Sequence, residues 1–308
     1  MENGIVVIGA TFMDIKGYSL GQYIPAGRNA GYVEEVHGGV ARNIAEDIAN
    51  VELRPTFVSL VDNTGSGRSI LEKLENHKVN TKYIRQVKDG MGTWLAIFDQ
   101  NGDVVSSISK RPDLVPICQI LDEEGDEIFS NADCVALEID IDKEIVKRTF
   151  KYAEKYNLKV FAVVSNMSIA VERRDFIQKA ECFVCNQQEA GILFMDNYED
   201  KTPEELLEIL PKKIAGANIK KMVVTMGAQG AIYVSMDGES GFCPARDVEV
   251  KDTTGAGDSF FAGVTIGMSH GMSMREACEI GATLAASVIV THDNVCPRFL
   301  PGEFGIEA

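Results

Sequence analysis

A glycine-containing segment near the C-terminal end of the chain constrains the fold more strongly than any other stretch. Residues 252–258 read Asp-Thr-Thr-Gly-Ala-Gly-Asp, and the apolar residues 260–264 follow almost directly. Two glycines around a small residue let backbone N–H groups point into one space, and the apolar run predicts a helix whose positive N-terminal end faces that space. We therefore expect an anion-binding site at Gly255, Ala256 and Gly257, in front of a helix that packs into a core.

Asp258 lies in the first turn of this predicted helix. A carboxylate beside a pocket that attracts negative charge suits phosphoryl transfer, because the amides can hold the phosphoryl oxygens while Asp258 takes the proton from an incoming hydroxyl. On these residues alone an alternative stays open. The segment can be an ordinary helix cap in which Asp258 only complements the helix dipole.

Composition and charge limit the classes of function. The chain has 308 residues, which fits one large α/β domain or two ordinary ones, and 46 acidic against 30 basic residues give a net charge of −16. This charge argues against a general nucleic-acid surface and against anionic membranes, although a few backbone amides can still hold a nucleotide's phosphates. No apolar run has the length of a membrane span and no leader segment is recognisable, so we expect a cytoplasmic protein.

The seven cysteines predict reduced thiols rather than a disulfide framework, because their number is odd and they are scattered over a long chain. Cys182 and Cys185 have the spacing of a redox or zinc motif, but no second pair accompanies them. Because they lie in a short apolar run, we expect them to be buried in the core.

Alternating strand and helix patterns predict a βαβ architecture with a mostly parallel sheet. Strands are expected at 5–10, 56–61, 134–138, 159–164 and 182–185, a strand leading to a glycine turn at 221–230, and helices at 65–77, 142–156 and 277–290. Two segments interrupt this rhythm, a polar excursion over 23–36 and a hairpin over 92–105 around Asn101-Gly102. The hairpin belongs either to a small separate sheet or to the edge of the main sheet.

Residues 252–260, Asp-Thr-Thr-Gly-Ala-Gly-Asp-Ser-Phe, closely resemble the C-terminal signature of the ribokinase, or PfkB, family of sugar and nucleoside kinases. Gly38-Gly39, followed four residues later by Asn43, is similar to the family's N-terminal signature. The resemblance implies a single kinase domain over 1–308 with a ribokinase-like three-layer α/β/α fold, a mostly parallel central sheet and a small β-sheet lid from about 12–36 and 92–110. It also implies that Asp258 is the catalytic base and that Gly255, Ala256 and Gly257 form the anion hole.

At the substrate end, the resemblance implies contacts to the acceptor from a set of five residues: Asp14, Gly38, Gly39, Asn43 and Glu138. The family carries Asn-x-Asp where this chain has Phe12-Met13-Asp14, so the Asp matches and the Asn does not. Asp14 follows the first predicted strand, at the sheet edge where α/β proteins bind ligands. On its own, it can equally be a solvated loop acid.

At the nucleotide end, the resemblance implies ATP and magnesium as cofactors. The residues expected to bind ATP are Asn186, Thr225, Gly227, Gly230, Thr254 and Ala282. Glu189, in Asn186-Gln187-Gln188-Glu189, matches a motif associated with the phosphates and water-bound Mg²⁺. Asp252 matches a position that in many relatives helps to bind a monovalent cation, K⁺, behind the anion hole.

The expected reaction is phosphorylation of a primary hydroxyl on a neutral furanose, with pseudouridine as the first candidate and ribose or adenosine next. Asp14 and Glu138 suit neutral hydroxyls and would repel a phosphate. One alternative is a kinase of a phosphorylated sugar such as fructose 6-phosphate or fructose 1-phosphate, and another is a sugar-binding regulator that kept the fold and lost turnover. The resemblance also suggests a homodimer formed through the lid.

Overall fold

The computed structural model describes residues 4–100 and 104–306 and contains two sheets. The large sheet has nine strands in the order β13-β12-β11-β10-β9-β8-β1-β4-β5, and the small sheet has four in the order β3-β2-β6-β7. The strands are β1 Ile5–Ile8, β2 Phe12–Ser19, β3 Gly31–Gly38, β4 Thr56–Asp62, β5 Ile84–Val87, β6 Gly92–Phe98, β7 Val104–Lys110, β8 Cys134–Glu138, β9 Lys159–Val163, β10 Cys182–Asn186, β11 Lys221–Thr225, β12 Gly230–Ser235 and β13 Ser240–Pro244.

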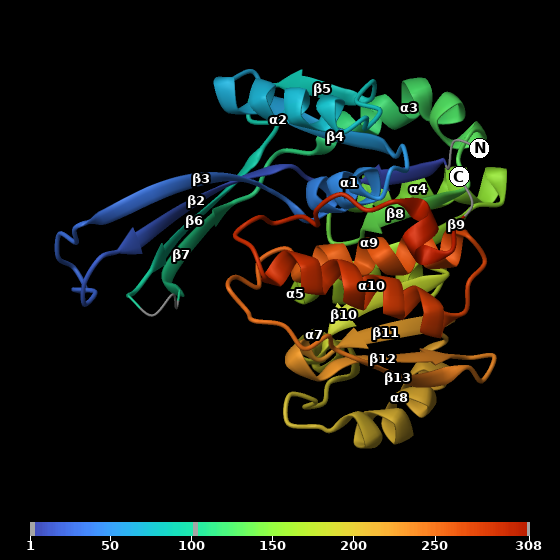
Figure 1. Ribbon diagram of the computed structural model, residues 1–308. Helices are drawn as coiled ribbons and strands as arrows, with labels where there is room; N and C mark the ends of the chain where they lie inside the picture. Colours follow the sequence, from blue (N-terminus) through green and yellow to red (C-terminus); the bar gives the residue numbers. More distant parts are fainter. Residues whose placement is uncertain (1–3, 101–103, 307–308) are drawn as a thin grey trace.

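The helices cover both faces of the large sheet, as Figure 1 shows. They are α1 Val40–Asn50, α2 Gly65–Asn76, α3 Val115–Ser130, α4 Lys143–Tyr156, α5 Met167–Ala170, α6 Arg174–Ile177, α7 Gln187–Phe194, α8 Pro203–Ala217, α9 Ala256–Ser269 and α10 Met274–Ile289, with 3₁₀ turns at Val171–Arg173, Gly227–Gln229 and Pro301–Phe304. One buried cluster joins α1, α2, α9 and α10 to the sheet, and a second joins α3, α4, α6, α7 and α8 to the opposite face. The predicted three-layer arrangement is confirmed.

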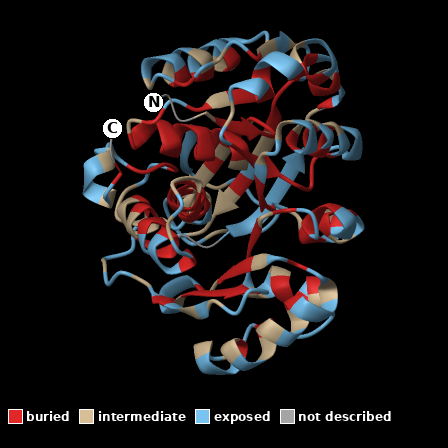
Figure 2. Cartoon of the chain, turned by 90° about the vertical axis from the view of Figure 1, so that its right-hand side faces the viewer, coloured by how far each residue is buried: buried red, intermediate tan, exposed pale blue. Residues whose placement is uncertain are grey.

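The apolar strands are buried because both of their faces are covered. In β1, Ile5 and Val7 pack in one cluster while Val6 and Ile8 pack in the other, so every side chain of the strand is enclosed. Pairing is parallel from β5 across to β11, and β12 and β13 add two antiparallel strands at one edge. Figure 2 shows the buried central strands in red and the outward surfaces of the helices in pale blue.

The small sheet extends from one side of the large sheet as a lid (Figure 1). In it β2 pairs with β3 and with β6, and β6 pairs with β7. The alternative that the 92–105 hairpin lies at the edge of the main sheet is therefore wrong. Asn101 and Gly102 of the predicted turn lie outside the described residues. Asp14 lies within β2 and is 8% exposed, so the alternative of a solvated loop acid is wrong as well.

Many element ends lie within one or two residues of the sequence prediction, and one larger difference has a local cause. The helix expected to begin at Ala277 begins at Met274, because Ser273 and Glu276 form a capping box that satisfies the first backbone N–H groups. All seven cysteines are free and buried, as expected. Within the described residues, no helix is both long and apolar enough to cross a membrane.

The contact between α9 and α10 generates a stability prediction. A Cβ on Gly263 would lie 2.5 Å from the backbone nitrogen of Gly281, whereas a Cβ on Gly216 in α8 would meet nothing within 4 Å. We expect Gly263→Ala to lower the free energy of unfolding by about 1 to 3 kcal/mol, because two helix backbones must separate. Gly216→Ala, the matched control, should raise it by about 0.5 kcal/mol. Urea unfolding measures both, and equal effects would contradict the packing argument.

Candidate active site

The predicted anion site lies at the start of α9. Gly255 is the N-cap with a φ of +82°, and a Cβ there would lie 2.0 Å from the carbonyl oxygen of Asn294, so only glycine fits the turn. A Cβ on Gly257 would meet nothing within 4 Å, which leaves its backbone accessible. The first N–H groups of a helix have no intrahelical acceptor, so the start of α9 can hold an anion.

Asp258 is held by α1, which packs against α9. Asn43 Nδ2 donates a hydrogen bond to Asp258 Oδ2 at 2.6 Å. The Arg42 guanidinium donates to Asn43 Oδ1, to the carbonyl oxygen of His37 and to Glu46, so the Asn43 amide can present only its NH₂ group to Asp258. Two residues expected from separate motifs, 215 positions apart, are thus in direct contact.

Burial sets the protonation behaviour of the two acids near this contact. Desolvation raises the pKa of Asp258 to about 7, although the hydrogen bond from Asn43 and the charge of Arg42 oppose the shift. Desolvation also raises the pKa of Asp14 to about 6, against the charges of Lys16 and Arg42. A carboxyl group with a pKa near neutrality is suited to general-base work, since it is available as base and still basic enough to accept a proton.

Gly38 contacts Asp14, whereas Glu138 contacts Ala10 and Ser165. A Cβ on Gly38 would lie 2.4 Å from a carboxylate oxygen of Asp14, and Gly39 starts α1 with a φ of +100°. Glu138, at the end of β8, accepts hydrogen bonds from Ala10 N at 3.0 Å and from Ser165 Oγ at 3.2 Å. Burial, followed by the charge of Asp140, raises the pKa of Glu138 well above its usual range. Glu138 lines a cavity of about 300 Å³.

A larger cavity of about 550 Å³ lies on the other side of the anion hole. Its lining includes five of the residues expected to bind ATP, together with two from the anion hole: Asn186, Thr225, Gly227, Gly230, Ala282, Ala256 and Gly257. Thr254 is the exception. Its hydroxyl donates to Asp252 Oδ1 at 2.6 Å, and the neighbouring Thr253 lines the cavity in its place.

Glu189 has a local structural role. Its carboxylate accepts from Asn186 N at 2.8 Å, and Asn186 Oδ1 accepts from Glu189 N, which forms a capping box at the start of α7. Among the described residues, no group of three His, Cys, Asp or Glu side chains could hold a metal ion. The half-buried carboxylate of Glu189 fits an Mg²⁺ ion that would be held mainly by substrate phosphates and water.

Asp252 does not fit the expected K⁺ site. Its Oδ1 accepts from Thr254 N at 2.8 Å and from Thr254 Oγ1 at 2.6 Å, while its Oδ2 faces Lys16 Nζ at 3.3 Å. Both carboxylate oxygens are therefore engaged, and an ammonium group already supplies the positive charge.

Sequence reasoning missed Asp47, which lies one turn after Asn43 on α1. It is fully buried, its Oδ2 is 2.8 Å from Ser259 Oγ, and its Oδ1 accepts from Cys296 N at 2.6 Å. Asn43 and Asp47 are four residues apart and therefore lie on the same face of α1. From this face Asn43 contacts Asp258 and Asp47 contacts Ser259. The sequence did contain a signal for this residue, because an acid four positions after Asn43 falls on the apolar face of the helix.

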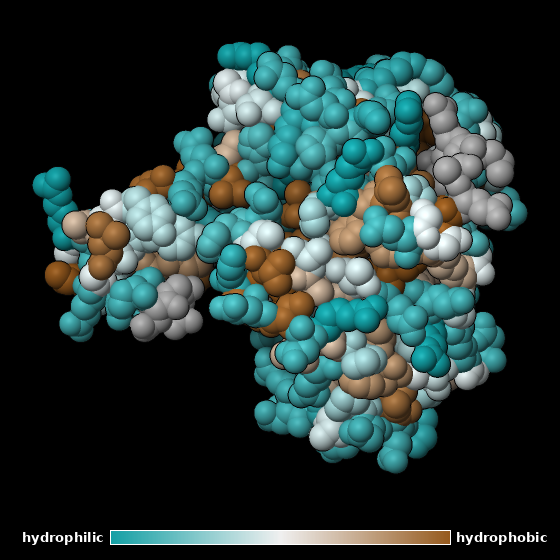
Figure 3. Space-filling view, viewed as in Figure 1, coloured by the Kyte–Doolittle hydropathy of each residue, from teal (hydrophilic) through white to brown (hydrophobic). Residues whose placement is uncertain are grey.

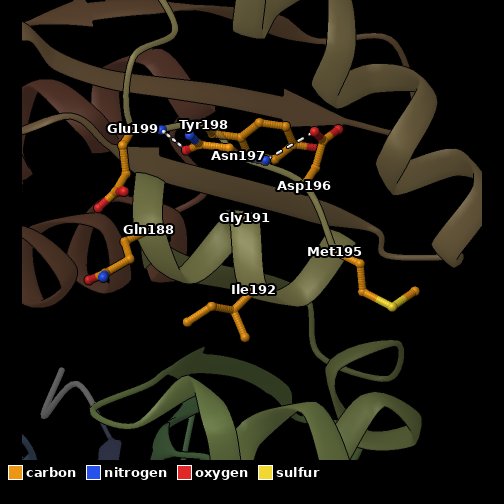
Figure 4. Close-up of a pocket in the computed structure, with 8 residues that line it drawn as sticks. All are labelled: Gln188, Gly191, Ile192, Met195, Asp196, Asn197, Tyr198 and Glu199. Carbon is orange, nitrogen blue, oxygen red and sulfur yellow. Dashed lines mark hydrogen bonds between the residues drawn. The ribbon is translucent and has the colours of Figure 1, made fainter.

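A separate surface pocket is formed by α7 and the residues that directly follow it (Figure 4). It is lined by Gln188, Gly191, Ile192, Met195, Asp196, Asn197, Tyr198 and Glu199. None of the expected site residues lines it, so it does not belong to the catalytic arrangement.

Comparison with known proteins identifies the family. The model of the pfkB family of carbohydrate kinases matches residues 2–297. This chain belongs to the PfkB family. It is similar to the guanosine-inosine kinase of Exiguobacterium acetylicum, with 32% identity over 95% of this chain and 96% of that protein. It is also similar to the pseudouridine kinase of Escherichia coli, with 25% identity over 89% and 86% of the two chains.

The structure of Arabidopsis thaliana ribokinase complexed with ribose and ATP shares the fold, with a TM-score of 0.83, 21% identity and 99% coverage of both chains. The PfkB resemblance seen in the sequence is confirmed. This PfkB protein is a sugar or nucleoside kinase, and its family supports ATP as the phosphoryl donor. The alternative of a regulator without turnover is set aside.

Asp47 generates a prediction about pH and stability. Burial raises the pKa of Asp47 to about 8, so the folded state holds the proton more tightly than the unfolded state, and wild-type stability falls as pH rises from about 4 to 8. Asp47→Asn mimics the protonated acid. We expect the free energy of unfolding of the variant, relative to that of wild type, to rise by more than about 1 kcal/mol from pH 5 to pH 8.5. Urea unfolding at both pH values measures this, with the exposed Asp175→Asn as control. A constant difference between variant and wild type would contradict it.

Proposed function

We propose that this kinase phosphorylates the primary hydroxyl of a neutral nucleoside with ATP, using Asp258 as general base. One observation carries the proposal: Asp258, held by Asn43, directly follows Ala256 and Gly257, which line the cavity of the expected nucleotide residues. The proposed base, Asp258, and the cavity proposed to hold the phosphates therefore lie next to each other at the start of α9.

In the proposed reaction, Asn43 and Asp14 orient the acceptor sugar and the Asp258 carboxylate takes the proton of the attacking hydroxyl. The N–H groups of Gly255, Ala256 and Gly257 stabilise the charge on the transferred phosphoryl group. Mg²⁺, when bound, neutralises charge between the terminal phosphates, and Glu189 is the residue that would hold it through water. Water is excluded by the lid, whose strand β2 carries Asp14.

The charges near the acceptor end favour a neutral substrate over a sugar phosphate. Arg42 is paired with Glu46, Arg111 contacts Asp140 at 3.3 Å, and Lys110 contacts Asp89 at 2.9 Å. These cations are each committed to a carboxylate. A phosphate near Asp14 would be repelled by about 1 to 4 kcal/mol in a partly solvated site.

The lid supports a nucleoside rather than a free sugar. Strand register places Tyr18, Trp94 and Phe98 on the same face as Asp14. Tyr18 and Phe98 stack with centroids 4.8 Å apart, and Trp94 meets Phe98 edge-on at 6.3 Å. An aromatic surface beside the acceptor acid can stack on a nucleobase. The guanosine-inosine kinase relative makes guanosine and inosine the first acceptors to test, followed by pseudouridine, ribose and adenosine.

The opposite face of the lid supports our proposal of a homodimer. Val33, Leu95 and Ile108 point away from the site by strand alternation, and they are 69%, 38% and 69% exposed. Figure 3 shows apolar atoms on the surface of the lid. Two lids that pack through this face would bury these side chains while leaving Asp14 toward the site.

Asp258 gives the first functional prediction. Asp258→Asn keeps the shape and removes the proton acceptor, so kcat should fall by about 10² to 10⁴ while the affinity for ATP changes little. Because burial raises the pKa of Asp258 to about 7, wild-type kcat/KM should fall as pH drops below about 7, and the variant should lack this limb. Steady-state rates from pH 5.5 to 9 test both statements. The exposed Asp175→Asn is the control, and wild-type turnover in Asp258→Asn would refute the assignment.

The acceptor class gives a second prediction. We expect kcat/KM on guanosine or inosine to exceed that on fructose 6-phosphate and fructose 1-phosphate by at least about tenfold, because Arg42, Lys110 and Arg111 are each paired with a carboxylate instead of being available for a second phosphate. ATP consumption with these four compounds, pseudouridine, ribose and adenosine measures the order. Higher efficiency on a sugar phosphate would contradict this order. It would show that Arg42, Lys110 and Arg111, and not Asp14, determine which acceptor binds.

A further inference from the structure

Lys16 is a buried lysine on the lid strand β2 that the reaction described above does not use. We propose that its ammonium group is the fixed cation that orders the anion-hole loop through Asp252, so that the kinase requires no monovalent metal cation there. The inference rests on the proposed function, since the loop matters only if it binds the phosphoryl group.

The position of Lys16 follows from strand alternation. Asp14, Lys16 and Tyr18 share one face of β2, the face toward the site. The Lys16 side chain is 1% exposed, and its Nζ lies 3.3 Å from Oδ2 of Asp252, 236 positions away in the chain. Asp252 is itself only 20% exposed. The ion pair therefore joins the lid to the main body, with the lysine fully enclosed and the carboxylate partly buried.

Lys16 and Asp252 depend on each other energetically. A buried charge is tolerated only with a partner, and removing one member leaves the other charge uncompensated. The hydrogen bonds from Thr254 and the charge of Lys16 hold the pKa of Asp252 below its usual value, although burial opposes them. Asp252 thus stays ionised and can accept from both Lys16 and Thr254.

A short series of contacts leads from Lys16 to the anion hole. Lys16 fixes Oδ2 of Asp252, and Oδ1 of Asp252 accepts from the backbone and hydroxyl of Thr254. Thr254 directly precedes Gly255, whose Cα packs against the backbone of Asn294. The N–H groups of Gly255 to Gly257 must point correctly before the phosphoryl group arrives, because preorganised donors stabilise charge most effectively. Lys16 is accordingly a positioning residue.

The wild-type enzyme provides the first test, which needs no variant. Rates of ATP consumption should agree within about twofold in chloride salts of K⁺, Na⁺ and tetramethylammonium at equal ionic strength. The midpoint of thermal unfolding should be the same in the three salts, because a cation bound only to the folded state would raise it with concentration. Activation by K⁺ above about fivefold, or a stabilisation specific to K⁺, would overturn the proposal.

Variants of Lys16 provide the second test. Lys16→Met should lower kcat about 10- to 100-fold with little change in the KM for ATP, because the loop is present but poorly ordered. Lys147→Met, which removes an exposed lysine 3.0 Å from Glu144, is the matched control. In Lys16→Ala, methylammonium or ethylammonium ions should restore part of kcat, an effect that a merely structural lysine would not give. Wild-type kcat in Lys16→Met would overturn the proposal.

A double-mutant cycle separates this inference from the proposed function. The kcat losses of Lys16→Met and Asp252→Asn should not multiply in the double variant, because the two residues act as one pair. Independent, multiplicative losses would overturn the role of the pair while leaving Asp258 catalysis intact. Conversely, failure of every nucleoside as acceptor would refute only the proposed substrate, since the cycle can be run on whichever acceptor turns over.

Discussion

The contact between Asn43 and Asp258 is the interaction on which the rest of the site depends. It joins α1, whose N-cap is Gly39, to α9, whose N-cap is Gly255, and both glycines have positive φ. Removing the Asp258 carboxylate from water raises its pKa toward neutrality, while the Asn43 amide and the Arg42 charge keep it from rising further. The near-neutral pKa on which the proposed base catalysis relies thus follows from packing two helices together.

The backbone conformation explains why the two helix starts at Gly39 and Gly255 could be predicted from the sequence. Gly39 and Gly255 adopt conformations that disfavour other residues, and the runs behind them have helical periodicity, so a local pattern carries the information. Six of the nine strands of the large sheet were predictable because strands buried on both faces are continuously apolar, whereas the edge strands β5 and β13 are only partly buried and were not predicted. The lid strands were expected from turn residues and alternation, although their pairing into a separate sheet needed the resemblance to the family.

Other features of the site could not be read locally. Asp47 contacts Ser259 from 212 positions away, and Lys16 contacts Asp252 from 236, so no short window of sequence contains either pair. Thr254 was expected to face the nucleotide, but a hydrogen bond to Asp252 turns its hydroxyl away. Glu189 was expected near a metal, and its carboxylate also caps α7. The contacts of Asp47 and Lys16 are tertiary, whereas Thr254 and Glu189 are oriented by local hydrogen bonds to residues two and three positions away.

The buried charges divide into two groups with different tasks. Arg42 neutralises Glu46 and orients Asn43, which serves the proton acceptor. Lys16 pairs with Asp252, which holds Thr254 of the loop that we propose receives the phosphoryl group. Because Arg42 and Lys16 are each matched to a nearby carboxylate, neither leaves a net positive field for a second phosphate, and the buried acids Asp14 and Glu138 favour hydroxyl groups. The same pairing that makes these charges tolerable in the interior therefore also disfavours a phosphorylated acceptor.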